Sequence, residues 1–126
     1  MKPEVLGIIE LDSIASGYIV LDAVIKAAPV SVLKAEMLNP GKFIIFLTGD
    51  VASVEFSMDA GIEAGVEAVL DHVLLQNLSS QVFPAMEKGG GPVSSSTGGN
   101  RLDALGIIET YTTASAIEAA DAAAKA

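Results

Sequence analysis

Cysteine and histidine, two of the side chains that most often carry catalysis or bind metals, are almost absent from this chain. It has no cysteine and a single histidine, His72, so it offers no thiolate nucleophile, no cysteine-ligated iron–sulfur cluster and no Cys/His zinc site. His72 lies in an alternating apolar and polar segment with no second ligand at a suitable spacing, and we interpret it as a structural histidine. Asp12 and Ser13 have no nearby base that would activate the serine.

Two further sequence patterns could indicate a metal site or a phosphate-binding loop, but neither supports that function. Glu55, Asp59, Glu63 and Glu67 recur every four residues, which places them on one face of a predicted helix. Carboxylates at this spacing are usually a solvated outer face, so we predict no metal site. The glycine run 89–91 lacks the Lys-Ser/Thr pair of a phosphate-binding loop. We therefore predict neither an enzyme nor a resident cofactor.

Composition indicates a small acidic domain with an assembly surface. The chain has 126 residues, and sixteen acids against seven bases give a net charge of −9, which argues against nucleic acid as a partner. The longest charge-free apolar stretch, 13–21, is only about half of a membrane span, and the N-terminus lacks the basic and apolar regions of a signal peptide. Hydrophobic residues reach 51% with only 5% aromatics, which favours close-packed interfaces between subunits.

The chain contains an internal repeat that it does not finish. LGIIE at 6–10 recurs at 105–109, and carrying this offset of 99 residues along 6–27 adds six matches, giving eleven identities over 22 positions. We interpret the chain as a complete domain at 1–86, a Gly/Ser-rich linker at 87–101, and the first strand and helix of a second, incomplete domain at 102–126. Such a tail is too short to fold alone. It must be disordered, dock on a neighbour or require further residues.

The hydrophobic pattern of the sequence predicts the order of strands and helices in the first domain. Apolar runs predict strands, and three- and four-residue apolar spacings predict helices. The expected elements are a strand at 5–11, a helix at 14–28 capped by Ser13, strands at 30–37 and 42–48 joined by a type II turn, a helix from Val51 capped by Asp50, a strand at 69–76 and a short helix at 80–86. This β-α-β-β-α-β order is an α+β, ferredoxin-like arrangement with helices packed on an antiparallel sheet.

The spacing of large apolar residues also predicts which helical faces are buried. For the first helix these residues are Ile14, Tyr18, Leu21, Val24, Ile25 and Ala28, and for the second they are Val51, Val54, Met58 and Ile62.

With these elements in place, the sequence resembles bacterial microcompartment shell proteins of the BMC-domain family. The resemblance rests on LGIIE at 6–10, LDAVIKAAPV at 21–30 and PGKFIIFLTGDVASVEFSMDAGIEAG at 40–65. ALGIIETYTTASAIEAADAAAKA at 104–126 resembles the start of another such domain. Two domains in one chain are similar to the tandem members of the family, above all those of propanediol-type compartments.

The resemblance implies a structural role. In this family six domains form a disc with a central pore, discs tile into a sheet, and the shell encloses enzymes in the bacterial cytoplasm while small metabolites pass. The implied partners are copies of the chain, as a hexamer or as a trimer that mimics one, together with other shell proteins. Neither nucleic acid nor membrane is implied.

The resemblance also assigns roles to individual residues at the edge of the disc. Lys26 matches the family's edge lysine, and Lys125 is its counterpart in the second copy. The residues alone also explain Lys26 as a solvated helix lysine paired with Asp22. Asn77 stands where many family members carry an arginine that packs against that lysine, which weakens the expected tiling.

A second set of residues falls on the family's pore loop, namely Leu38, Asn39, Pro40 and Gly41. A type II turn explains the same residues, and both interpretations can hold together. Some tandem relatives bind an iron–sulfur cluster through a cysteine on this loop. Asn39 stands there instead and is a poor ligand for such a cluster, so none is expected.

One function of another class stays open, a regulatory module in which a small molecule binds between ferredoxin-like subunits. Sheets or tubes in the electron microscope would favour the shell, whereas discrete trimers with a ligand-induced melting shift would favour the regulator.

Overall fold

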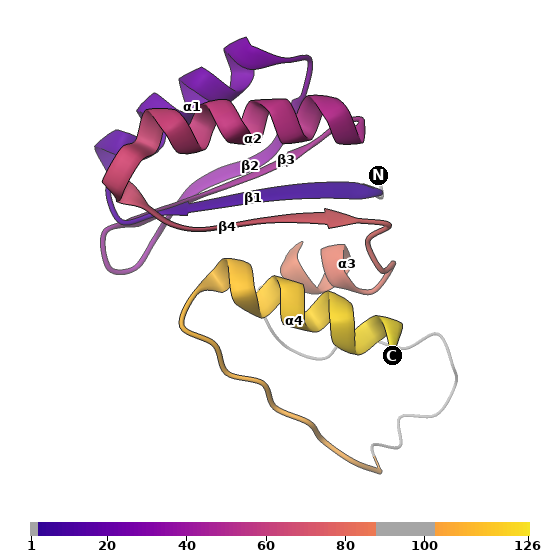
Figure 1. Ribbon diagram of the computed structural model, residues 1–126. Helices are drawn as coiled ribbons and strands as arrows, with labels where there is room; N and C mark the ends of the chain where they lie inside the picture. Colours follow the sequence, from indigo (N-terminus) through magenta and orange to yellow (C-terminus); the bar gives the residue numbers. More distant parts are fainter. Residues whose placement is uncertain (1–2, 88–102) are drawn as a thin grey trace.

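The computed structural model describes residues 3–87 and 103–126. The expected linker at 87–101 therefore lies outside the described residues, apart from Glu87. The elements are β1 (Val5–Leu11), α1 (Ile14–Ala27), β2 (Ser31–Leu38), β3 (Lys42–Thr48), α2 (Val51–Gly65), a 3-10 turn (Val66–Ala68), β4 (Val69–Gln76), α3 (Val82–Glu87) and α4 (Thr113–Lys125). Up to α3 this is the predicted order, with boundaries shifted by at most two residues (Figure 1).

The sheet has the strand order β2-β3-β1-β4, and every neighbouring pair is antiparallel. β1 is its centre, where Ile9 pairs with Ile45 of β3 on one side and with His72 of β4 on the other. All seven residues of β1 are buried. A strand without apolar and polar alternation is typical of a sheet covered on both faces, and this explains the continuous run.

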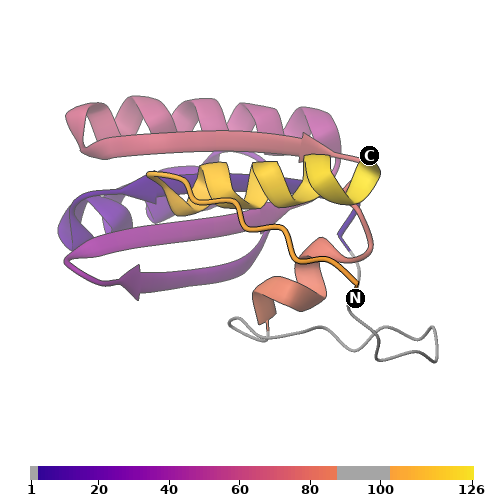
Figure 2. The same ribbon diagram turned by 90° about the horizontal axis from the view of Figure 1, so that it is seen from below.

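Helices cover both faces of the sheet. α1 and α2 lie on one face, whereas α3 and α4 lie on the other (Figures 1 and 2). Side chains of β1 alternate between two cores. Ile9 and Leu11 join α1 and α2, and Leu6 and Ile8 meet α3 and the C-terminal helix α4. The fold therefore places the C-terminal residues directly on the first domain.

The predicted buried face of α1 is wrong in part. Gly17, Val20 and Val24 point inward, while Tyr18 and Ile25 are 58% and 55% exposed. A Cβ on Gly17 would lie 2.5 Å from the Phe43 ring, so the missing side chain is what lets the helix approach the sheet. Tyr18 still contacts Phe43, with the ring centroids 5.1 Å apart and the ring planes inclined at 49°.

Small residues also set the contact between the two helices of this layer. In α2 the buried residues are Val54, Ser57, Met58, Gly61 and Gly65, so Val54 and Met58 follow the prediction and Ile62 is only partly buried. A Cβ on Gly61 would lie 2.7 Å from Val24 of α1. A search for large apolar residues misses this face because the contact requires small ones.

The strand expected at the start of the repeat is not formed. Residues 103–110 have no regular secondary structure, although they contain the same LGIIE letters as β1. β1 is a strand because β3 and β4 satisfy its backbone groups on both sides, whereas 103–110 are paired with no strand. Leu105 and Ile107 are consequently more than three quarters exposed.

Candidate functional site

The C-terminal helix docks on the open face of the first domain's sheet. α4 buries Ala114, Ile117 and Asp121. Ala114 and Ile117 join an apolar cluster that includes Ile8 of β1 and Ile44 of β3. This face, with Glu10 and Asp71 near one end of the helix and Gln76 and Ser79 near the other, is called the receptor face below.

Glu10 anchors the first turn of α4. It is fully buried in β1, and its Oε1 accepts a hydrogen bond from the backbone N–H of Ala114 at 3.0 Å. Its Oε2 has no hydrogen-bond partner, and the Lys42 Nζ lies 3.7 Å away. A carboxylate at a helix N-terminus interacts favourably with the partial positive charge of the unpaired N–H groups. The same helix end therefore helps to stabilise a charge buried in the sheet.

Asp71 of β4 holds the residues that cap α4. Its Oδ2 accepts from the hydroxyls of Thr112 at 2.6 Å and Ser115 at 2.8 Å, and its Oδ1 accepts from the His72 N–H. Thr112 in turn caps the helix by accepting from the Ser115 N–H at 3.1 Å. The hydrogen bond from Thr112, followed by those from Ser115 and His72, holds the pKa of Asp71 below its usual value against the opposing effect of burial.

The other end of α4 is held by a second acid. Asp121 Oδ1 accepts from the Ser79 N–H at 2.8 Å, and its Oδ2 accepts from the Lys125 Nζ at 2.6 Å. Burial favours a higher pKa for Asp121, but the hydrogen bonds from Lys125 and Ser79 outweigh it and lower the pKa. Lys125 also donates to the carbonyl of Gln76 at 3.2 Å. Polar contacts at both ends thus fix the position of the helix along the sheet.

The edge residues expected from the sequence lie in two places. Lys26 is on the outer side of α1, paired with Asp22 at 2.8 Å with both side chains more than half exposed. Lys125 lies at the end of β4 beside Gln76, the residue that precedes Asn77. Asn77 is exposed with a φ of 53°. The structure therefore brings Lys125 to the segment that contains Asn77 and keeps Lys26 away from it within one chain.

The expected pore residues form the turn between β2 and β3. Asn39, Pro40 and Gly41 are exposed and Leu38 is half-buried. Gly41 has the positive φ of 70° that a type II turn needs at its third position, and the Asn39–Pro40 peptide bond is cis. The turn projects from the sheet at the end opposite the N-terminus (Figure 1).

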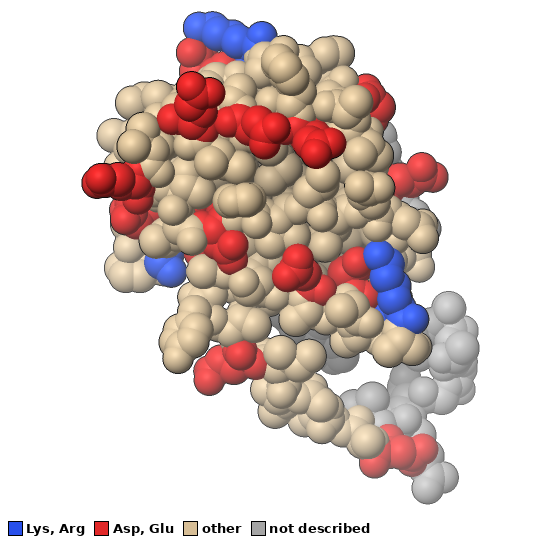
Figure 3. All heavy atoms as spheres, viewed as in Figure 1, with Lys and Arg blue, Asp and Glu red and all other residues tan. Residues whose placement is uncertain are grey.

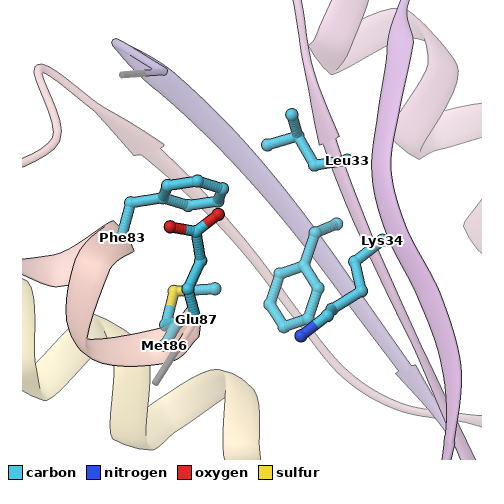
Figure 4. Close-up of a pocket in the computed structure, with 6 residues that line it drawn as sticks. Leu33, Lys34, Phe83, Met86 and Glu87 are labelled. Atoms are coloured by element: carbon cyan, nitrogen blue, oxygen red, sulfur yellow. The ribbon is translucent and has the colours of Figure 1, made fainter. Parts of the chain in front are cut away.

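The remaining hollows and charged groups show no reactive arrangement. A small depression between α3 and β2 has apolar walls that include Leu33, Phe83 and Met86, with Lys34 and Glu87 at its rim (Figure 4). The acids of α2 form a row on the surface of the helical layer (Figure 3). Within 3–87 and 103–126, no group of three His, Asp or Glu residues could hold a metal ion, and no helix is long and apolar enough to cross a bilayer.

Comparison with known proteins decides the family. The family model described as the BMC domain matches residues 5–78, which run from the start of β1 to just beyond β4. The chain belongs to the BMC-domain family. The resemblance found in the sequence is thereby confirmed, and so is the α+β fold.

One relative and one solved structure match almost the whole chain, and a second relative matches less than half of it. The chain is 36% identical over 123 residues to the bacterial microcompartment shell protein PduT of Citrobacter freundii, covering 98% of this chain and 63% of PduT. It is 38% identical over 56 residues to the shell protein EutK of Escherichia coli K12, covering 44% of this chain and 34% of EutK. A crystal structure of a microcompartment protein from Desulfitobacterium hafniense DCB has a TM-score of 0.71 at 36% identity, over 98% of this chain and 64% of that one. The chain thus spans less than two thirds of the length of PduT.

One feature of the sequence could have indicated the receptor face before the structure was known. Glu10 and its counterpart Glu109 are the only charged residues in their repeated LGIIE segments. An acidic side chain in a buried strand needs a hydrogen-bond donor or an opposite charge from outside that strand. The positions of Asp71, Gln76 and Ser79 carry no comparable signal, because each lies in an ordinary strand end or turn.

Proposed function

We propose that this protein is a structural subunit of a bacterial microcompartment shell, and that it works in the bacterial cytoplasm as part of that shell. The observation that carries the proposal is the match to the shell protein PduT along 98% of the chain. Exposed apolar side chains on α1, including Tyr18, Ile19 and Ile25, support it because such a patch favours contact between subunits. The role requires no catalytic residue.

In this proposal the unit of assembly is the domain. Residues 1–86 form one complete domain, 87–101 are a linker, and 102–126 begin a second domain. Copies of the chain join into hexameric discs or into trimers that mimic them, together with other shell proteins. The repeat at an offset of 99 residues and the docking of α4 on the receptor face support this division, because the repeated helix packs as a separate element on the first domain.

The pore of the disc is assigned to Leu38, Asn39, Pro40 and Gly41. Three of the four residues are exposed on a turn that projects from the sheet, which supports a position facing an axis. The loop has no charged side chain, so it suits the passage of small metabolites without selection by a fixed charge.

The edge of the disc is assigned to Lys26, Asn77 and Lys125. Lys26 is 73% exposed, and Lys125 remains 39% exposed even with α4 docked. A lysine at this helix position can therefore reach a neighbouring disc while its helix is packed.

Negative-stain electron microscopy with light scattering tests the proposed function. We expect discs, and sheets or tubes at higher protein concentration, either from the protein alone or after mixing with a hexameric BMC shell protein. A particle that stays monomeric in both experiments would contradict it. Discrete trimers whose melting temperature rises with a small ligand would favour the regulatory module instead.

A further inference from the structure

β4 is an outer strand of the sheet, and one of its edges is open. The strand order β2-β3-β1-β4 gives β4 a single neighbour, β1. In Figure 1 β4 passes between α2 above it and α4 below it. The free edge of β4 therefore runs along a surface that these two helices border.

Two hydrogen bonds show which backbone groups of β4 point away from β1. The His72 N–H donates to the Oδ1 of Asp71, and the Gln76 carbonyl accepts from the Lys125 Nζ. Successive residues of an antiparallel strand alternate in the side to which their N–H and C=O groups point. Leu74, midway between His72 and Gln76, therefore directs both of its backbone groups outward. In the part of the chain that the structure describes, no backbone hydrogen bond from outside the sheet reaches Leu74.

The other outer strand, β2, has features that hinder pairing with a further strand, and β4 lacks them. The pairing of β2 with β3 shifts register between Val32 and Lys34, and the Lys34 side chain is 44% exposed. Irregular pairing and exposed lysines are common protections of a sheet edge. β4 pairs regularly with β1 from Asp71 to Gln76 and contains neither lysine nor proline. The edge of β4 is therefore the one that can accept a further strand.

A hollow of about 160 Å³ lies beside this edge, between α2 and β4. It is lined by three apolar and three polar side chains, namely Met58, Ile62 and Leu74 with Glu55, Asp59 and His72. Glu55 and Asp59 are exposed, lie one turn apart on α2 and belong to the acidic row seen in Figure 3. No described lysine forms an ion pair with either acid. The hollow thus combines apolar walls with uncompensated negative charge.

The position of the hollow fixes which residue of an added strand would enter it. Side chains of directly opposed residues in an antiparallel pair lie on the same face of the sheet. Leu74 packs on the side of α1 and α2, so the side chain opposite it also points to that side. The aliphatic stem of a lysine or arginine there can pack on Met58 and Ile62, while its charged end reaches the two acids. The hollow therefore favours a long basic side chain.

A second copy of this protein fits the same edge poorly. Antiparallel pairing of two β4 strands about a two-fold axis places both α2 helices on one face of the joined sheet, with their acidic rows toward each other. Like charges repel, and the chain already carries a net charge of −9. Charge complementarity favours a basic partner instead.

We propose that the free edge of β4 binds an extended segment of a partner protein as a fifth, antiparallel strand, with a lysine or arginine opposite Leu74. The backbone of the segment exchanges N–H···O=C hydrogen bonds with Leu74, and the basic side chain lies in the hollow between α2 and β4. Backbone pairing supplies affinity, and the hollow selects the side chain. The inference goes beyond the proposed function and does not depend on it, because the open edge and the hollow belong to a single chain.

Fluorescence anisotropy with a labelled heptapeptide tests the proposal on the full chain. The peptide alternates lysine and valine and begins and ends with lysine, so that all its lysines lie on one face of the strand. One matched version is N-methylated at the inner lysines and the other at the valines. Methylation at the lysines should weaken binding at least about tenfold, because these N–H groups face β4. Methylation at the valines, whose N–H groups face solvent, should change it less than about twofold.

Equal affinities of the two methylated peptides, or the reverse order, would overturn the inference, and so would the absence of saturable binding by the parent peptide. Anisotropy that falls again at high protein concentration would assign the edge to a second copy and likewise reject the basic partner. Assembly into discs is not part of the measurement, so the shell role stands or falls separately.

Charge reversal tests the hollow itself. Glu55→Lys should weaken binding of the parent peptide at least about fivefold, because it replaces attraction by repulsion inside the hollow. Glu63→Lys makes the same charge change two turns further along α2, outside the hollow, and should have less than about a twofold effect. Equal losses would reduce the binding to general charge attraction and overturn the proposal. Circular dichroism checks that both variants stay folded, and Asp59→Asn replaces Glu55→Lys if that variant does not.

Discussion

Glu10 and Ala114 are 104 residues apart in the sequence and joined by a hydrogen bond of 3.0 Å in the structure. The carboxylate is fully buried at the centre of the sheet, and the N–H belongs to the first turn of the docked helix. This contact connects the two copies of the repeat, because Glu10 ends the first LGIIE segment and Ala114 lies just after the second.

Replacing Glu10 should release α4 while the first domain stays folded. Glu10→Leu leaves the Ala114 N–H without its acceptor, which costs about 1–3 kcal/mol of docking free energy. Glu10→Gln keeps an acceptor and should cost less. Hydrogen exchange of the α4 amides is the measurement, with Glu55→Leu on the exposed side of α2 as the control. Unchanged α4 protection in Glu10→Leu would remove Glu10 from the docking contact.

Docking of α4 should weaken in acid. The pKa values of Asp71 and Asp121 lie below the ordinary value of 3.8 when α4 is docked. The undocked form therefore binds protons first as the pH falls, so the stabilisation is complete well above pH 3.8 and is lost as the pH drops through the lowered pKa values. Hydrogen exchange of α4 between pH 6 and pH 3 measures this loss, and Asp71→Asn should flatten the profile. A profile that Asp71→Asn leaves unchanged would contradict it.

Gly17→Ala should destabilise the first domain. The added methyl would lie 2.5 Å from the Phe43 ring, which is itself in the core. The better helix propensity of alanine, worth about 1 kcal/mol, opposes the clash without removing it, and we expect a net loss of about 1–3 kcal/mol. Urea denaturation measures it. Gly106→Ala is the matched control, because a Cβ there meets nothing within 4 Å. Equal stability of the two variants would show that α1 can shift outward at little cost.

Lys26→Asp should still form single discs but reduce or prevent their assembly into sheets. The side chain is 73% exposed and its only described ion pair is with Asp22, so the fold should survive. Its repeat counterpart Lys125 stays partly exposed when α4 is docked. We therefore expect Lys26→Asp to leave the disc intact, while the contacts between neighbouring discs lose a positive charge. A contribution of only about 1 kcal/mol per contact is repeated across a sheet.

Electron microscopy and light scattering of Lys26→Asp give the result, beside Lys34→Asp as an exposed lysine on β2. Discs with smaller or no arrays are expected. Unchanged sheets would remove Lys26 from the edge, and loss of the disc itself would place it in the contact between subunits.

Local sequence was sufficient for the elements of the first domain. β1, β3 and β4 follow from apolar runs ended by turn residues, and the caps Ser13 and Asp50 mark helix starts that the structure reproduces, each accepting from the N–H three residues on. These features depend on neighbours within a few residues, so they can be predicted from the sequence alone. The LGIIE repeat likewise indicated the family that the comparisons confirm.

Only the tertiary structure decided which faces meet. Tyr18 looked like a core residue and is exposed, because Gly17 and Gly61 allow a closer approach than any large side chain does. The second LGIIE segment is not a strand, because a strand needs neighbouring strands that pair with its backbone N–H and C=O groups, and its own sequence cannot supply them. The receptor face joins Glu10, Asp71 and Ser79 to residues of α4 that lie more than forty positions further along the chain than the residue each one contacts. Which distant groups share a surface depends on how the chain folds back on itself, and no local pattern in the sequence encodes that.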